Sequence, residues 1–339
     1  MKLIHTVDAA GHVLCHDLTQ IIKDTYKDAR FRKGHVVTEE DIPVLLSMGK
    51  EHLYVWEMVP GMVHENDAAE RLCALCINDR MERSPVKEGK IELTAACDGL
   101  FQVDSARLLA VNSTEDMMIA TRHGNTAVRR GDKLAGTRVI PLVIPEEKLQ
   151  GAENAAGPAP LLKLLPWKLR TAAIVATGSE VKSGLIQDTF TPVVRDKLAA
   201  FGIDTLAVSY SGDGVENVAN AITEVRKTGA ELILCTGGMS VDPDDNTPGG
   251  IRAAGARIVS YGAPVLPGAM LLVGYFSDGT PVLGLPGCVM YAGATVFDLV
   301  LPRIAAGVEI TRSDIAAMCE GGLCLGCKPC RWPVCPFGK

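Results

Sequence analysis

The sequence lacks three features that mark common classes of protein. It has no excess of positive charge, because 34 Lys and Arg residues stand against 40 Asp and Glu, which excludes a general attraction to nucleic acid or an anionic membrane. Its apolar runs, such as residues 269–276, fall far short of the roughly 20 residues of a membrane-spanning helix. Residues 1–17 contain no apolar segment with a cleavage site, as secretion would require. We therefore expect a cytoplasmic protein that binds neither membrane nor nucleic acid.

The composition is that of a folded chain with more than one domain. Of the 339 residues, 47% are hydrophobic and 22% are charged, which is enough material for several buried cores. Residues 1–150 contain short mixed segments and predict an α+β region with room for two subdomains. In it we expect helices at 38–48 and 66–79 and a strand at 52–56. Small residues and prolines then predict a linker over 151–170, before an α/β domain over 171–307 and a Cys-rich tail over 308–339.

The α/β domain is indicated by apolar strand-like runs that alternate with helical stretches. The expected strands are 171–177, 204–210 and 231–236, and the expected helices are 188–200, 215–228 and 291–306. The segment 265–287 predicts a hairpin that turns at residues 277–279. Strands separated by helices form right-handed crossovers, so we expect a three-layer αβα fold around a mainly parallel sheet.

Small and acidic residues follow three of these strands. The segments are 177–181, 211–214 and 237–245, and carboxyl ends of parallel strands meet at one edge of a sheet. Exposed backbone amides there suit phosphate, and carboxylates suit Mg²⁺ that bridges phosphate oxygens. The alternative for each loop taken alone is structural, because Gly makes tight turns and Asp or Ser caps the next helix. The three loops together favour a phosphorylated ligand held with a metal ion.

The same domain contains no histidine, because all seven lie before residue 124. It also has no Ser, His and Asp order of the hydrolase type and no Walker A motif. Chemistry at the strand ends would therefore rest on carboxylates, backbone amides and a metal ion.

An ordered set of short motifs runs through residues 170–307. They are Thr177-Gly178-Ser179-Glu180, Gly184-Leu185-Ile186-Gln187-Asp188-Thr189, Gly212-Asp213, Gly237-Gly238-Met239-Ser240-Val241 and Gly284-Leu285-Pro286-Gly287. In this order they resemble the molybdopterin-binding domain of molybdenum cofactor biosynthesis proteins, in particular the molybdopterin molybdenumtransferase family. The segment Phe31-Arg32-Lys33-Gly34 also resembles a piece of that family's N-terminal half.

The resemblance implies binding of molybdopterin or adenylated molybdopterin, and insertion of molybdate with Mg²⁺-assisted release of AMP. Carried over by motif, the catalytic acids would be Glu180, Asp213 and Asp245, of which Asp213 and Asp245 would hold Mg²⁺. The residues lining the cofactor would be Thr177, Gly178, Ser179, Asp188, Gly237, Gly238, Ser240, Pro286 and Gly287. We also expect a homo-oligomer.

Two departures from the family pattern leave other functions open. The family's Lys-Pro-Gly-Lys anion site is Leu266-Pro267-Gly268-Ala269 here, without either lysine. The Asn expected after Leu285-Pro286-Gly287 is Cys288, which is either a thiolate of lowered pKa or a small buried thiol. One alternative is a non-catalytic carrier of molybdopterin or molybdenum cofactor, or an accessory protein. The other is a molybdopterin adenylyltransferase or a relative of nucleotide pyrophosphatases, so whether the protein is an enzyme stays open.

Five of the eleven cysteines crowd into the last 21 residues. Cys324, Cys327, Cys330 and Cys335 offer four thiolates at a spacing that can close around one metal centre, either an iron–sulfur cluster or Zn²⁺. The alternative is free thiols or two disulfides on a loose tail. The histidines His5, His12 and His16 also lie close in sequence, but their spacing requires no metal site, so we expect surface or packing roles for them.

Overall fold

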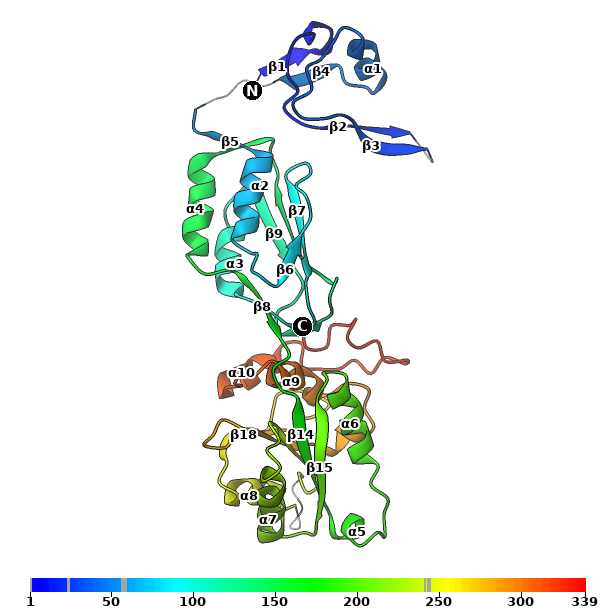
Figure 1. Ribbon diagram of the computed structural model, residues 1–339, viewed down its shortest axis with the longest axis vertical. Helices are drawn as coiled ribbons and strands as arrows, with labels where there is room; N and C mark the ends of the chain where they lie inside the picture. The colour runs from blue at the N-terminus through cyan, green and yellow to red at the C-terminus, as the bar shows by residue number, and fades with distance from the viewer. Residues whose placement is uncertain (1, 23–24, 56–59, 241, 243–244) are drawn as a thin grey trace. The chain divides into compact units, whose positions relative to one another are not determined.

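A computed structural model of the chain describes residues 2–22, 25–55, 60–240, 242 and 245–339 (Figure 1). Trp56, Val241 and Asp244, which figured in the sequence predictions, lie outside the described residues. The chain divides into two compact units, one of residues 1–96, 103–122 and 130–163 and the other of residues 97–102, 123–129 and 164–339. Among the described residues, no helix has the length and apolar character needed to cross a membrane.

The first unit begins with a small module of two-stranded antiparallel sheets. Strand β1 pairs with β4, and β2 pairs with β3. The elements are β1 Lys2–His5, β2 Leu18–Ile22, β3 Tyr26–Phe31, α1 Asp41–Ser47 and β4 His52–Val55. The core of this module contains Leu14, Leu45 and Leu53, each less than 3% exposed. The predicted helix at 38–48 is shorter than expected because the Asp41 carboxylate accepts the Thr38 N–H and holds residues 38–40 in a turn.

The rest of the first unit contains an antiparallel sheet in the order β6-β7-β11-β9, with helix α2 packed on β7 and β11. Strand β12 pairs with β5. A separate three-stranded sheet, in the order β10-β8-β13, lies mostly within the second unit. The elements from residue 62 to 166 are β5 Met62–His64, α2 Glu65–Ala74, β6 Met81–Arg83, β7 Lys90–Ala95, β8 Gly99–Val103, α3 Ser105–Asn112, β9 Met117–Thr121, β10 Thr126–Val128, β11 Lys133–Val139, β12 Val143–Pro145, α4 Glu146–Ala156 and β13 Leu162–Pro166.

The segment expected to be a linker, 151–170, is largely folded. Its first part continues α4, because the Ala and Glu residues there are strong helix formers that outweigh the single Gly151. Its second part forms β13, in which Leu162 and Leu164 are buried. Burial of these leucines, rather than the Pro and Gly content, decides the structure of this segment.

The second unit is built on a six-stranded sheet in the order β15-β14-β16-β19-β18-β17. The first four strands are parallel, and β18 and β17 join them as antiparallel partners. The elements are β14 Thr171–Thr177, α5 Ser179–Lys182, α6 Phe190–Ala199, β15 Asp204–Ser211, α7 Val215–Arg226, β16 Ile233–Thr236, α8 Thr247–Ala253, β17 Arg257–Tyr261, β18 Leu272–Tyr275, β19 Pro281–Leu285, α9 Val296–Ala305 and α10 Arg312–Ala316.

Helices cover both faces of this sheet. On one face, Ile174 of β14 shares a core with residues of α6, α9 and α10. On the other, Ala173 and Val175 share a core with residues of α7 and α8. Successive β14 side chains thus enter opposite layers, as the alternation of a strand requires. The predicted three-layer αβα fold with a mainly parallel sheet is confirmed.

The Cys-rich tail packs on the second unit. Phe337 is 2% exposed within the core on the α9 face, and its ring lies 5.6 Å from that of Trp332. Cys324 and Cys335 also contact this core. The last residues are therefore a packed part of the domain, because their apolar side chains are buried against its core.

Candidate functional site

The carboxyl ends of the parallel strands meet at one edge of the sheet, which we call the rim. The strand register places Thr177 of β14 beside Ser211 of β15, and Thr236 of β16 beside Leu285 of β19. The loops that follow these four residues contain every predicted cofactor-lining residue except Thr177, which ends β14, and Asp188. The rim is thus a continuous edge, as expected for a ligand site in an open α/β sheet.

Thr177 fixes the loop that follows β16. Its hydroxyl donates to the Thr236 carbonyl at 3.0 Å and lies 3.1 Å from the Thr247 hydroxyl, which in turn donates to the Gly237 carbonyl at 2.9 Å. Thr177 is only 8% exposed. Its hydroxyl is therefore engaged with protein groups, and it shapes the rim rather than facing a ligand.

Gly237 and Gly238 allow this loop to pack tightly. Both have positive φ, 83° and 56°, a region that L side chains rarely adopt. A Cβ on Gly237 would lie 2.4 Å from the Thr177 carbonyl oxygen, and one on Gly238 would lie 2.8 Å from the Thr247 hydroxyl oxygen. Only glycine fits either position.

Ser179 and Asp213 join the loops after β14 and β15. The Ser179 N–H donates to Asp213 Oδ2 at 3.2 Å, and the Asp213 N–H donates to Ser179 Oγ at 3.3 Å. A Cβ added to Gly178, whose φ is 133°, would lie 3.3 Å from Glu180 Oε1. The structure therefore brings together four predicted residues of two loops at one place on the rim.

Lys182 is a rim residue that the sequence reasoning missed. It is the last residue of the short helix α5, and its Nζ lies 3.9 Å from where a Cβ on Gly212 would be. Lys182 is exposed and forms no ion pair among the described residues. A signal was available, because a residue three positions after Ser179 lies on the same side of a helical turn. Lys182 supplies the rim with a cation.

The first turn of α7 adds unpaired donors to the same edge. The helix begins after Gly214, and no side chain of the described residues caps it. Its free N–H groups and its dipole favour an anion at this end. Helix α7 follows directly after Asp213, so these donors adjoin the Ser179–Asp213 pair.

Asp245 and Ser240 lie in the loop after β16. Asp245 Oδ2 accepts the Asp242 N–H at 3.0 Å, which closes a turn. The Tyr261 hydroxyl of β17 donates to the Met239 and Ser240 carbonyls at 3.0 and 3.3 Å. Burial, reinforced by the charge of Asp245, raises the pKa of Tyr261, so its hydroxyl stays a donor at neutral pH.

Asp188 accepts hydrogen bonds from the first residues of a helix. Its Oδ1 accepts the N–H groups of Phe190 and Thr191 at the start of α6, both at 3.0 Å. Burial opposes ionisation, but the hydrogen bonds from Thr191 and Phe190 outweigh it and lower the pKa of Asp188. This is the structural role that Asp commonly has before a helix.

The loop after β19 contains Pro286, Gly287 and Cys288, and residues 287–290 form a 3₁₀ turn. Burial raises the pKa of the Cys288 thiol, and the charge of Asp298 adds to this. A raised pKa favours the thiol form, which agrees with the interpretation of Cys288 as a small, partly buried thiol.

Neither predicted metal site is assembled. Across the described residues, no group of three or more His, Cys, Asp and Glu side chains is placed to hold a metal ion. Asp213 and Asp245 each accept a loop N–H. In the tail, Cys327 Sγ accepts the Arg331 N–H at 3.3 Å, whereas Cys330 packs against Gly293. The described donors thus do not fit Mg²⁺, an iron–sulfur cluster or Zn²⁺.

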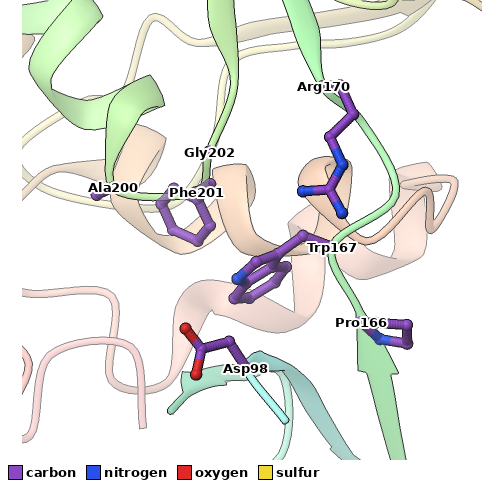
Figure 2. A pocket seen from close by; sticks show the side chains of 7 residues that line it. All are labelled: Asp98, Pro166, Trp167, Arg170, Ala200, Phe201 and Gly202. Carbon is purple, nitrogen blue, oxygen red and sulfur yellow. The ribbon is translucent and has the colours of Figure 1, made fainter. Parts of the chain in front are cut away.

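A hollow of about 350 Å³ lies at the opposite edge of the sheet (Figure 2). Trp167 and Phe201 form its wall, with ring centroids 4.9 Å apart, and Arg170 extends toward it. Arg170 precedes the first residue of β14, so this hollow is separate from the rim. It contains none of the predicted site residues.

Two family models match the chain. Residues 173–306 match the family described as "Probable molybdopterin binding domain", and residues 3–57 match a domain of unknown function, DUF8806. The first match spans the described sheet and the rim. The resemblance of this domain to molybdopterin-binding domains is therefore confirmed.

Curated relatives match only a short part of the chain. A CinA-like protein of Desulfosudis oleivorans is 38% identical over 89 residues, which cover 26% of this chain and 21% of that protein. A CinA-like protein of Mycobacterium avium is 32% identical over 76 residues, covering 22% of this chain and 18% of that protein. The chain thus spans about a fifth of the length of these relatives.

Some solved structures are similar to part of this chain. The molybdopterin biosynthesis enzyme MoaB of Thermus thermophilus is 22% identical, covering 40% of this chain and 92% of that one, with a TM-score of 0.35. The tungsten cofactor synthesizing protein MoaB of Pyrococcus furiosus is 18% identical, covering 40% and 93%, with a TM-score of 0.34.

Proposed function

We propose that the α/β domain binds molybdopterin, or its adenylated form, at the rim, and that the protein acts in molybdenum cofactor biosynthesis. The observation that carries this proposal is the family match over residues 173–306, which contains the whole rim. The loops at the rim offer what a phosphorylated pterin needs, namely backbone donors on tightly packed glycine turns and a nearby cation.

The phosphate would lie between the start of α7 and Lys182. The uncapped N–H groups of α7 supply donors, and the ammonium group of Lys182 supplies a positive charge at the same edge. Ser179 and Asp213 hold the two loops in this arrangement through their reciprocal hydrogen bonds. The Gly237–Gly238 turn, fixed by Thr177, would give the ligand close access to the backbone.

The reaction proposed for the bound ligand is insertion of molybdate with release of AMP, with Glu180, Asp213 and Asp245 as the acidic residues. Mg²⁺ at the rim, and an iron–sulfur cluster or Zn²⁺ in the tail, stay predictions from the sequence. The described side chains do not gather for any of these metals, so the proposal uses none of them.

A carrier role is the second candidate, and one observation favours it. The segment 266–269, which replaces the family's lysine-containing anion site, is paired with the tail. Leu266 N–H donates to the Gly322 carbonyl, and the Cys324 N–H donates to the Leu266 carbonyl, both at 2.8 Å. A Cβ on Gly268 would lie 2.4 Å from Val296, so this segment is also tightly packed. It offers no cation to molybdate, as expected of a protein that holds the cofactor without loading metal.

The test is anaerobic incubation of the purified protein with adenylated molybdopterin, molybdate and Mg²⁺, with AMP measured by chromatography. The transferase proposal expects AMP release above a blank without protein, and its loss in Asp213→Asn. Stoichiometric binding of the pterin without AMP release would support the carrier. Absence of both binding and release would contradict the proposed function.

Lys182→Gln tests the phosphate position. Loss of the ammonium group should weaken binding by about tenfold, because a hydrogen bond to a charged group contributes about 1.5–3 kcal/mol. Lys227→Gln is the matched control, since Lys227 is an exposed lysine of the same domain that follows the other end of α7 and pairs only with Glu224. Equal affinities of the two variants would place the phosphate elsewhere.

A further inference from the structure

Two histidines face each other across the N-terminal sheet. Strands β1 and β4 are antiparallel, and their register places His5 directly opposite His52. Along β4 the side chains alternate, with Leu53 and Val55 buried and His52 exposed. His5 is also exposed. The two imidazoles therefore stand together on the solvent side of the sheet, although they lie far apart in sequence.

The rings are close, and the part of the chain that the structure describes offers them no other polar partner. Their centroids lie 4.4 Å apart, with the ring planes tilted by 41°. Among the described residues, neither imidazole has a hydrogen bond or an ion pair. His35, in contrast, bonds to Asp41 at 2.7 Å. The ring nitrogens of His5 and His52 are thus available to an external ligand.

The backbone beside the pair is firmly held. The Thr6 N–H donates to the Glu51 carbonyl at 3.0 Å, and the Thr6 hydroxyl donates to the Lys50 carbonyl. Thr6 is fully buried. Because both strands are fixed at this point, little conformational entropy would be lost when one ion binds both rings.

We propose that His5 and His52 form a two-imidazole site for a divalent transition-metal ion of the Ni²⁺ and Zn²⁺ class. Each ring offers one neutral nitrogen lone pair, the ligand that such ions prefer, and water fills the remaining positions. Mg²⁺ and Ca²⁺, which prefer oxygen ligands, are rejected. The site lies within residues 3–57, in the domain of unknown function, so it is independent of the molybdopterin proposal.

Calorimetric titration of the full-length protein with NiCl₂ at about pH 7.5 tests this site. The exposed thiols, which include Cys319, Cys327 and Cys330, are first blocked with N-ethylmaleimide so that they do not bind the metal. We expect one Ni²⁺ per chain, with affinity falling in the order Ni²⁺, Co²⁺, Mn²⁺.

Two variants and one control decide whether both rings bind the ion. His5→Gln and His52→Gln should each weaken Ni²⁺ binding by about tenfold or more, and the double variant should bind no better than either single variant. His12→Gln, which removes another exposed histidine of the same module, should leave binding unchanged. All three substitutions lie on the surface, and thermal unfolding without metal verifies that each variant is folded. Wild-type affinity in either His5→Gln or His52→Gln would overturn the proposal.

Discussion

The hydroxyl of Thr177 is predicted to hold the rim together, and Thr177→Val removes it while keeping the side chain's shape. The variant loses the bond to the Thr236 carbonyl and the contact with the Thr247 hydroxyl. Each such hydrogen bond contributes about 1 kcal/mol net, and a buried acceptor left without a donor costs about 1–3 kcal/mol. We therefore expect the free energy of unfolding of the α/β unit to fall by about 2 kcal/mol.

Urea unfolding followed by tryptophan fluorescence measures this change, because Trp167 and Trp332 both lie in the α/β unit. Thr223→Val is the matched control, since the Thr223 hydroxyl donates only to the Ala219 carbonyl of its own exposed helix. Its effect should stay within about 0.5 kcal/mol. In the double variant Thr177→Val/Thr247→Val the losses should be less than additive, because the two hydroxyls share one contact. A Thr177→Val protein as stable as the wild type would refute this role.

Three further predictions concern other parts of the chain. Burial raises the pKa of Glu65 to about 7, so its ionisation opposes folding. Stability should therefore fall by up to about 3 kcal/mol as pH rises from about 4.5 to about 7, and urea unfolding of Glu65→Gln should lack this pH dependence. Phe337→Ala should lower the unfolding free energy by about 3–5 kcal/mol, and an unchanged melting temperature would show that the tail is not part of the core. Gly237→Ala should lower the melting temperature of the α/β unit far more than Gly279→Ala, because Gly279 also has positive φ but nothing within 4 Å of the added Cβ.

The fold of the α/β unit was largely predictable because its strands are buried on both faces. Such strands appear as continuous apolar runs, and the run at 171–177 coincides with β14. The strand β17 escaped prediction because its short, half-exposed sequence carries no such signal. The predicted linker contains a boundary between the two units, at residues 163 and 164. Its helix and strand were missed because the buried leucines outweigh the weak Pro and Gly signal.

The position of the candidate site could be predicted from the sequence, but the hydrogen bonds that join its residues could not. The order of strands and loops is enough to gather Ser179, Asp213 and Gly237 at one edge. The contact between Thr177 and Thr247 joins residues 70 positions apart, and it depends on how α8 packs. Asp188 accepts the first N–H groups of α6, and the sequence motif alone does not distinguish this capping role from contact with a ligand. The His5–His52 pair needs the register of two strands, which no local pattern reveals.

The most direct test of the central claim is hydrogen exchange of the rim with and without molybdopterin under anaerobic conditions. The account predicts slower amide exchange on binding in residues 178–183, 212–217 and 237–240, with no change in the hollow formed by Trp167 and Phe201. Binding that leaves these three rim segments unchanged, or protection confined to other parts of the chain, would contradict the claim that the rim holds the cofactor.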